Sequence, residues 1–326
     1  MAMQTQGMRK ERLDRGIKVR SDGIYAVSHW QEMAYLLAPR LLLILGLLSL
    51  PLVFAWLPYW QRVLSMVCIF SLLALSFDFL AHYVGLVSLG GALYIGVGAY
   101  VSALLNTEFG LPVFLCIPLA TFLGGGFCTL LLWPCLPLRG VYFAIVSLMF
   151  PLLAGRVIEA FDIFGGTEGL FGLDGFANKW VEQYMIISCL LVILFFMRRL
   201  VNEDVGLVFR GVKDNDQAVK ASGININTFK AVGVFLASSM GCLGGATLAH
   251  IYMWAGLSQF GLDFSIIPIA ATVVGGGGTL VGPVLGCMLL VPISELLRDF
   301  GTLRIAVYAV ILTAFIVFKS EGLMVY

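Results

Sequence analysis

Ionisable side chains are rare inside the long apolar runs of this sequence, and Asp78 is the most prominent of them. It stands in the segment Ser76-Phe77-Asp78-Phe79-Leu80, one helical turn before His82 and near one end of an apolar run. Carboxylates within a membrane are energetically costly and usually functional. At a helix end, however, Asp78 can instead reach the interface or cap a neighbouring helix. The residues leave both interpretations open, and Asp78 is a candidate residue of a translocation path.

The remaining reactive side chains do not form a catalytic or metal-binding pattern. Arg156 and Glu159 have the spacing of a local ion pair on a helix. The 7 cysteines are scattered through apolar segments without a Cys-x-x-Cys pair, which is typical of small buried hydrophobic residues. The sequence lacks a Ser/His/Asp arrangement, and it lacks the buried carboxylates and histidines of a proton-driven pump. We therefore expect no catalytic residue, no metal and no cofactor in this chain.

The composition indicates a membrane protein. Of the 326 residues, 60% are hydrophobic and only 12% are charged, whereas soluble domains have roughly 45–50% apolar and 25% charged residues. The net charge of +1 excludes a nucleic-acid-binding protein, because phosphate contacts require a basic surface. Charged residues concentrate in the N-terminal tail and between Arg198 and Lys230. Neither stretch is long enough for a soluble enzyme domain.

Apolar runs of about 20 residues predict the membrane-spanning helices. They lie near residues 36–58, 62–81, 86–105, 111–135, 141–160, 184–201, 229–252, 265–291 and 303–319. These runs lack the alternation of barrel strands, and a helix satisfies its own backbone groups in lipid. We predict an all-α fold, a polytopic integral membrane helical bundle of about eight to ten segments. Residues 1–35 form a basic cytoplasmic tail and residues 36–326 the transmembrane domain.

The distribution of Lys and Arg orients this bundle, because positive loops stay in the cytoplasm. With the N-terminal tail inside, alternation places the loop 161–183 outside and the stretch 198–230 inside. The outer loop is acidic and has Lys179 as its sole Lys or Arg. The inner stretch holds Arg198, Arg199, Arg210, Lys213, Lys220 and Lys230. The charges therefore predict a cytoplasmic N-terminus.

Two glycine-rich runs are predicted to break membrane helices. One is Ser88-Leu89-Gly90-Gly91, and the other begins Gly275-Gly276-Gly277-Gly278 and ends at Gly282-Pro283. Glycine and proline destabilise helix interiors, so the segment 265–291 is expected to form two half-segments, which would return the C-terminus to the cytoplasm. Unwound backbone at membrane depth survives where protein or a water-filled cavity shelters it. A translocation path lined by Ser88, Gly90, Gly91 and Gly275 to Gly278 is one interpretation, and tight helix packing is the other.

The charged stretch 202–228 predicts a short helix over about Asn215–Ser222. Asp214 suits its N-cap with Gln217 in a capping-box-like arrangement, and Gly223 suits the position after its C-terminus. Such an element is either a plain interfacial helix or a coupling helix that docks on a soluble partner. Neither glycine-rich run has the spacing of a phosphate-binding loop. If ATP drives this protein, another chain must bind it.

Several segments, in this order, resemble the permease subunits of high-affinity branched-chain amino acid ABC importers, of the LivM type. They are SLGGALYIGVGAY (88–100), GVYFAIVSLMF (140–150), FGGTEGLFGL (164–173), FRGVKDNDQAVKASGININTFK (209–230), VVGGGGTLVGPVLG (273–286) and FKSEGL (318–323). The resemblance covers most of the chain from about Ser71 onward. These permeases commonly have His after Ser-Leu-Gly, where this sequence has Gly91.

The resemblance implies a coupling role for the stretch 202–228, at Asp214, Asp216, Ala218, Val219, Ser222 and Gly223. It also implies a LivH-type second permease, two cytoplasmic ATPase subunits that bind ATP and Mg²⁺, and an extracytoplasmic binding protein that delivers substrate. The chain would then be a transport subunit in a prokaryotic inner or plasma membrane, and not an enzyme. Branched-chain amino acids are the expected cargo, with urea or short amides as the alternative within the family. An ion-coupled secondary transporter is the rival class, for which Asp78 is the candidate coupling group.

Overall fold

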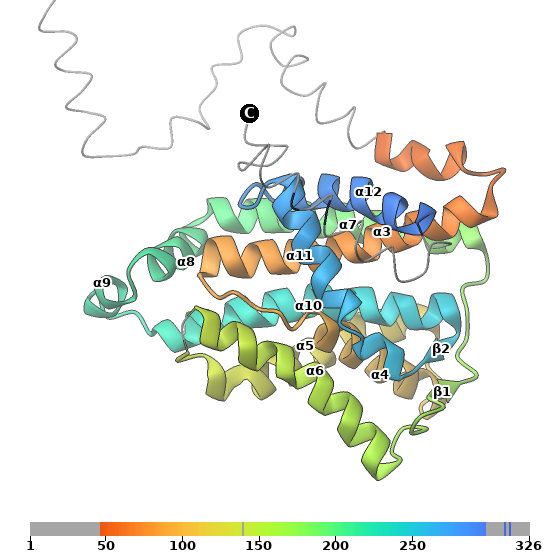
Figure 1. Cartoon of the computed structure of the whole chain (residues 1–326), viewed down its shortest axis with the longest axis horizontal. Coiled ribbons are helices and arrows are strands. Elements are labelled where there is room, and N and C mark those ends of the chain that lie inside the picture. Colours follow the sequence, from red (N-terminus) through yellow and green to blue (C-terminus); the bar gives the residue numbers. More distant parts are fainter. Residues whose placement is uncertain (1–45, 139, 298–309, 311–312, 314–326) are drawn as a thin grey trace, which may run out of the picture. The chain divides into compact units, whose positions relative to one another are not determined.

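The computed structural model describes residues 46–138, 140–297, 310 and 313 (Figure 1). Its internal contacts divide the chain into Met1–Ser49 and Leu50–Tyr326, and every helix and strand named below belongs to the second unit. The predicted tail 1–35 and its boundary at residue 36 lie outside the described residues. So do residues 36–45 of the predicted span 36–58, and all of the span 303–319 except residues 310 and 313. These assignments stay predictions.

The described part of the second unit is helical almost throughout. Five helices are long and apolar enough to cross a membrane: α3 (Pro58–Asp78) with its π-helical continuation η2 (Phe79–Val84), α5 (Val113–Leu132) with the 3-10 turn η3 (Trp133–Cys135), α6 (Val141–Phe161), α7 (Lys179–Asn202) and α10 (Ile226–Tyr252). Shorter apolar helices are α4 (Gly91–Thr107), α11 (Asp263–Gly275) and α12 (Val281–Leu296). The predicted helical membrane bundle is confirmed.

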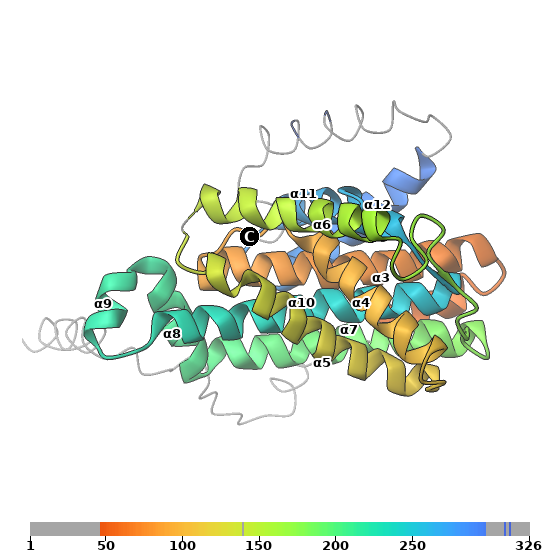
Figure 2. The same cartoon turned by 90° about the horizontal axis from the view of Figure 1, so that it is seen from below.

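Helices α3 and α10 form the centre of this bundle. Their apolar windows are 89% and 78% buried, against 28% for both α6 and α7. Figure 2 shows α3, α4 and α10 between α11 and α12 on one side and α5 and α7 on the other. The outer helices instead expose aromatic side chains such as Phe122, Tyr142 and Phe195, which suits contact with lipid because lipid tails are as apolar as these side chains.

Close contact between the central helices depends on glycine. A Cβ at Gly98 of α4 would overlap the backbone of Cys242 on α10, and a Cβ at Gly245 of α10 would overlap the backbone of Ile95. Small residues are enriched at membrane helix interfaces for this reason. The glycines within these helices therefore serve packing.

The two ends of the bundle carry different structures (Figure 1). Helices α8 (Asp204–Asp214) and α9 (Asp216–Ala221) lie at one end, and at the other β1 (Leu170–Phe171) pairs antiparallel with β2 (Trp254–Ala255), followed by the 3-10 helix η4 (Leu257–Phe260). This short sheet is a departure from the predicted all-α fold. The loop predicted outside and the stretch predicted inside do lie at opposite ends. Which end faces the cytoplasm stays a prediction.

Candidate functional site

The predicted break in the segment 265–291 is confirmed. Helix α11 ends at Gly275 and α12 begins at Val281, and residues 276–280 between them form the segment called the linker below. Gly276 and Gly278 have φ angles of 100° and 82°, which glycine adopts at little cost. Leu280 has a φ of 59°, where a side chain is strained. The surrounding structure must therefore hold the linker in place.

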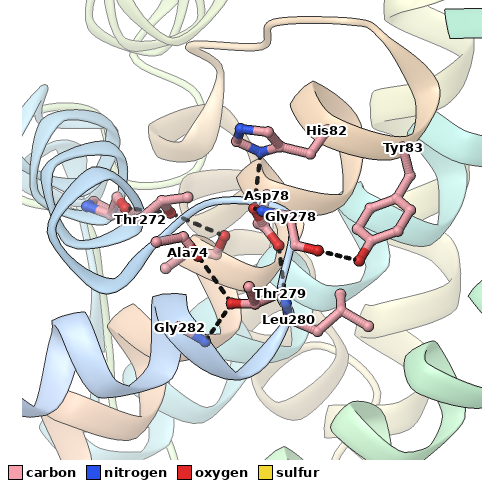
Figure 3. Close-up of polar contacts among 11 residues, drawn as sticks. Ala74, Asp78, His82, Tyr83, Thr272, Gly278, Thr279, Leu280 and Gly282 are labelled. Carbon is pink, nitrogen blue, oxygen red and sulfur yellow. Dashed lines mark hydrogen bonds and ion pairs between the residues drawn. The ribbon is translucent and has the colours of Figure 1, made fainter. Parts of the chain in front are cut away.

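Asp78 provides much of this support. Its side chain is 0% exposed, with Oδ1 accepting from the Gly278 N–H at 2.6 Å and Oδ2 from the Leu280 N–H at 3.3 Å (Figure 3). The Nδ1 atom of His82 lies 2.8 Å from Oδ1. A buried carboxylate needs donors such as the two backbone N–H groups, because leaving water is costly for a charge. The structure thus shows Asp78 as a cap of a neighbouring segment, and its role in translocation stays a prediction.

The π-helix η2 brings a second side chain to the linker. The Tyr83 hydroxyl donates to the Gly278 carbonyl oxygen at 2.6 Å (Figure 3). Gly278 is therefore bonded through both its N–H and its C=O to the α3–η2 segment. Short π-helical turns are frequent at functional sites. Sequence analysis missed Tyr83, because the apolar segment Phe79–Val84 has no feature that distinguishes a π-turn from an α-turn.

The predicted break at Ser88–Gly91 is also present, since residues 85–90 are not helical and α4 begins at Gly91. Hydroxyl groups pair with the free backbone N–H groups there. Ser147 Oγ accepts from Leu89 N at 2.9 Å, and Ser265 Oγ accepts from Ala92 N at 3.0 Å. This second break is thus held by neutral hydrogen bonds.

A cavity of about 10 Å³ lies between α3, residues 88–94 and α11. Ser88, Gly91, Tyr94 and Ser265 are among its lining residues. This volume fits about one water molecule and excludes an amino acid. The linker glycines are not among the lining residues, so the structure does not bring the two glycine-rich runs together at this cavity. The assignment of Ser88, Gly90, Gly91 and Gly275 to Gly278 to a translocation path stays a prediction.

Gly91 lies where the resembling permeases commonly have His. A Cβ at this position would come within 2.8 Å of the Phe264 carbonyl oxygen at the start of α11. Real Cβ atoms essentially never approach that closely. A larger residue at position 91 therefore requires α11 to move.

The predicted cytoplasmic helix is present as α9, but its cap differs from the prediction. Asp214 is the last residue of α8, and Asn215 is the N-cap of α9. Asn215 Oδ1 accepts from Gln217 N at 3.0 Å and Ala218 N at 3.2 Å. The prediction of Asp214 as cap is wrong because α8 keeps Asp214 helical, and Asn215 is the first residue with the extended backbone that a cap needs. Gly223, with a φ of 81°, follows the helix as predicted.

The six candidate coupling residues face two ways. Asp214, Ala218, Ser222 and Gly223 are exposed, whereas Asp216 and Val219 are half-buried. Asp216 Oδ2 accepts from Lys230 Nζ at 3.2 Å, and this ion pair, almost completely shielded from solvent, attaches α9 to α10. A groove of about 680 Å³ lies beside the pair, between α9, the start of α10 and Pro137. The pairing of Lys230 with Asp216 was not predicted, because the turn between α9 and α10 has no regular spacing that places the two residues together.

Comparisons with known proteins relate this chain to transport permeases. The family described as the permease component of branched-chain amino acid transport systems matches residues 59–319. The high-affinity branched-chain amino acid transport system permease protein LivM of Salmonella typhimurium is 26% identical over 293 aligned residues, which cover 80% of this chain and 69% of that protein. LivM of Escherichia coli gives the same identity and coverage. A probable LivM protein of Methanocaldococcus jannaschii is 25% identical over 143 residues, covering 42% of this chain and 41% of that protein. No solved structure matches.

Proposed function

Because the chain belongs to the family of permease components of branched-chain amino acid transport systems, we propose that it is one of two permease subunits of an ATP-binding cassette importer. A LivH-type permease supplies the other half of the translocation path. Two cytoplasmic ATPase subunits bind ATP and Mg²⁺, and an extracytoplasmic binding protein delivers branched-chain or related amino acids. This chain is then a transport subunit of a prokaryotic inner or plasma membrane, with no catalytic residue of its own.

The observation that carries the proposal is the position and exposure of α9. It lies at the end of the bundle opposite the β1–β2 pair (Figure 1). Along the chain, α8 and α9 connect the two long helices α7 and α10. Its residues Ala218 and Ser222 are exposed while Asp216 is bonded to Lys230 of α10. A short helix that is anchored on one face and open on the other is suited to receive a soluble partner and pass its movement to the bundle. The ATPases are the proposed partner.

The proposed mechanism uses α9 as the input. Closure of the ATPases around ATP pushes the exposed face of α9, and the ion pair between Asp216 and Lys230 carries the force to α10. Because α10 packs against α3, α4 and α5, its movement changes the contacts of the whole centre. The bundle then alternates between outward and inward openings.

Co-purification tests the docking of the ATPases. The full chain is produced with its neighbouring permease and ATPases, and ATPase recovery is compared between the wild type and Ala218→Asp. Aspartate is compatible with the first turn of α9 because negative charge is favourable near a helix N-terminus. A buried, unpaired charge in the docked interface is nevertheless costly, so we expect recovery to fall at least about tenfold.

The matched control is Ala177→Asp, the same change at an exposed position before α7, at the opposite end of that helix from α8. It should leave ATPase recovery unchanged. Recovery of the wild-type chain without any ATPase would contradict the importer, and equal recovery with Ala218→Asp would contradict docking at α9. Uptake of labelled leucine against labelled urea by the reconstituted complex then decides the cargo.

A further inference from the structure

The π-helix η2 is in contact with helix α8. Phe209 of α8 is completely buried and packs edge-on against Phe79 of η2, with ring centroids 5.5 Å apart. The guanidinium carbon of Arg210 lies 5.5 Å from the centroid of the Tyr83 ring, within the range of a cation–π interaction. Successive residues of α8 therefore contact both ends of the π-turn.

The residue that follows η2 completes this contact. Gly85 has a φ of 80°, and a Cβ there would lie 3.0 Å from the Lys213 Cα. A side chain at position 85 would therefore crowd Lys213 of α8. Because the rings of Phe209 and Phe79 and the pair of Arg210 and Tyr83 join α8 to η2 directly, we expect a shift of α8 along this face to displace η2.

The opposite side of η2 is bonded to the linker between α11 and α12. Tyr83 donates to the Gly278 carbonyl, and Asp78, directly before η2, accepts from the Gly278 N–H. The linker is also the place where α11 and α12 can change their relative angle, because its glycines tolerate large changes of φ. Tyr83 is the side chain that touches both partners. Its ring contacts Arg210 of α8, and its hydroxyl bonds to the linker (Figure 3).

We propose that Tyr83 is a positioning residue of the transport cycle, which couples displacement of α8 to the linker and so to the relative placement of α11 and α12. This inference rests on the proposed function, because the displacement of α8 originates from the ATPases. It adds a second route from the cytoplasm to the membrane, separate from the attachment of α9 to α10.

Three single variants isolate the contacts. Tyr83→Phe keeps the ring under Arg210 and removes the hydroxyl that bonds to Gly278. Arg210→Gln removes the cation and keeps a polar side chain of similar reach. Tyr100→Phe is the matched control, because it removes a buried phenol hydroxyl of α4 that has no hydrogen-bond partner among the described residues.

The measurement is hydrogen–deuterium exchange of the complete complex, with both permeases and both ATPases, in the presence and absence of a non-hydrolysable ATP analogue. In the wild type we expect the analogue to change exchange in residues 204–214 and in residues 274–285. Tyr83→Phe should preserve the response of 204–214 and reduce that of 274–285 about fivefold, the population change that one net hydrogen bond supports. Arg210→Gln should reduce the response of residues 274–285 about two- to fivefold, which corresponds to the loss of an exposed cation–π contact.

A double variant tests whether the contacts of Tyr83 with Arg210 and with Gly278 act in series. The double variant combines Tyr83→Phe with Arg210→Gln. If the two contacts act in series, its loss of response in residues 274–285 equals that of Tyr83→Phe alone, whereas two independent contacts give the product of the two single losses. An unchanged response of 274–285 in Tyr83→Phe, or an equal loss in Tyr100→Phe, overturns the inference while the importer stands. A wild-type complex that lacks ATPases, or whose residues 204–214 do not respond, contradicts the proposed function itself.

Discussion

The two interrupted membrane segments are held by different chemistry. The linker 276–280 is held by a buried carboxylate and a phenol from α3 and η2, whereas residues 85–92 are held by the hydroxyls of serines on α6 and α11. Charge-assisted hydrogen bonds are roughly twice as strong as neutral ones. The second break also borders a cavity that fits about one water molecule. We therefore expect the linker to change only when η2 moves, and residues 85–92 to exchange hydrogen-bond partners at lower cost.

Removal of the Asp78 carboxylate should produce the largest effect. In Asp78→Ala the N–H groups of Gly278 and Leu280 lose their acceptors inside the protein. We expect the free energy of unfolding in detergent to fall by about 3 kcal/mol, as for lost hydrogen bonds to a buried charge. The measurement is thermal unfolding, followed by the reaction of a fluorescent maleimide with buried thiols such as Cys68 and Cys287.

The control for this variant is Asp263→Ala, which removes an exposed carboxylate from the first turn of α11. Loss of a favourable charge at a helix N-terminus costs about 0.5 kcal/mol. A destabilisation of Asp78→Ala as small as that of Asp263→Ala would show that the linker does not depend on the carboxylate. The contrast between the two breaks would then be lost.

Enlarging Gly277 tests whether His82 confines the linker. This glycine does not have a positive φ, and a Cβ there would overlap the His82 ring. The ring is 39% exposed and has space to turn outward, so we expect Gly277→Ala to cost about 1–2 kcal/mol through the lost contact with Asp78. The measurement is the same thermal unfolding assay.

A double-mutant cycle identifies the cause of this cost. In the background of His82→Ala the obstacle is absent, and Gly277→Ala should then be nearly neutral. An equal cost in both backgrounds would place the constraint in the backbone of the linker. In that case His82 would have no part in confining it.

Among the described residues, the sequence was sufficient to locate the apolar helices and both breaks, because apolar length and the helix-breaking cost of glycine and proline act locally. The predicted run 141–160 corresponds to α6 (Val141–Phe161), and the run of glycines ends α11 at Gly275. Contacts between segments that are distant in the chain could not be predicted from the sequence. Asp78 and Gly278 are 200 positions apart, and no local pattern pairs them. The antiparallel pair β1–β2 was missed for the same reason, since each strand has only 2 residues.

The sequence also indicated a wrong N-cap for α9, because two neighbouring residues are both suited to that position. Asp214 and Asn215 are both good helix caps, and only the length of α8 decides between them. That length follows from the burial of Phe209 and Val212 against the bundle, which is a tertiary effect. The sequence thus located helix α9 to within one residue at each end, and packing determined its cap.

Removal of the Ser265 hydroxyl should produce the smallest effect and so sharpens the contrast. In Ser265→Ala the buried N–H of Ala92 loses its acceptor, but the adjoining cavity gains the volume of the hydroxyl and a water molecule can then bond to this N–H. We expect a loss of about 1 kcal/mol in the unfolding assay, against a change near zero for Ser188→Ala, an exposed serine that bonds within its own helix. A loss as large as that of Asp78→Ala would show that the second break is held as firmly as the linker. A small loss accompanied by faster hydrogen–deuterium exchange in residues 86–94 supports the view that this segment is the one that opens at low cost.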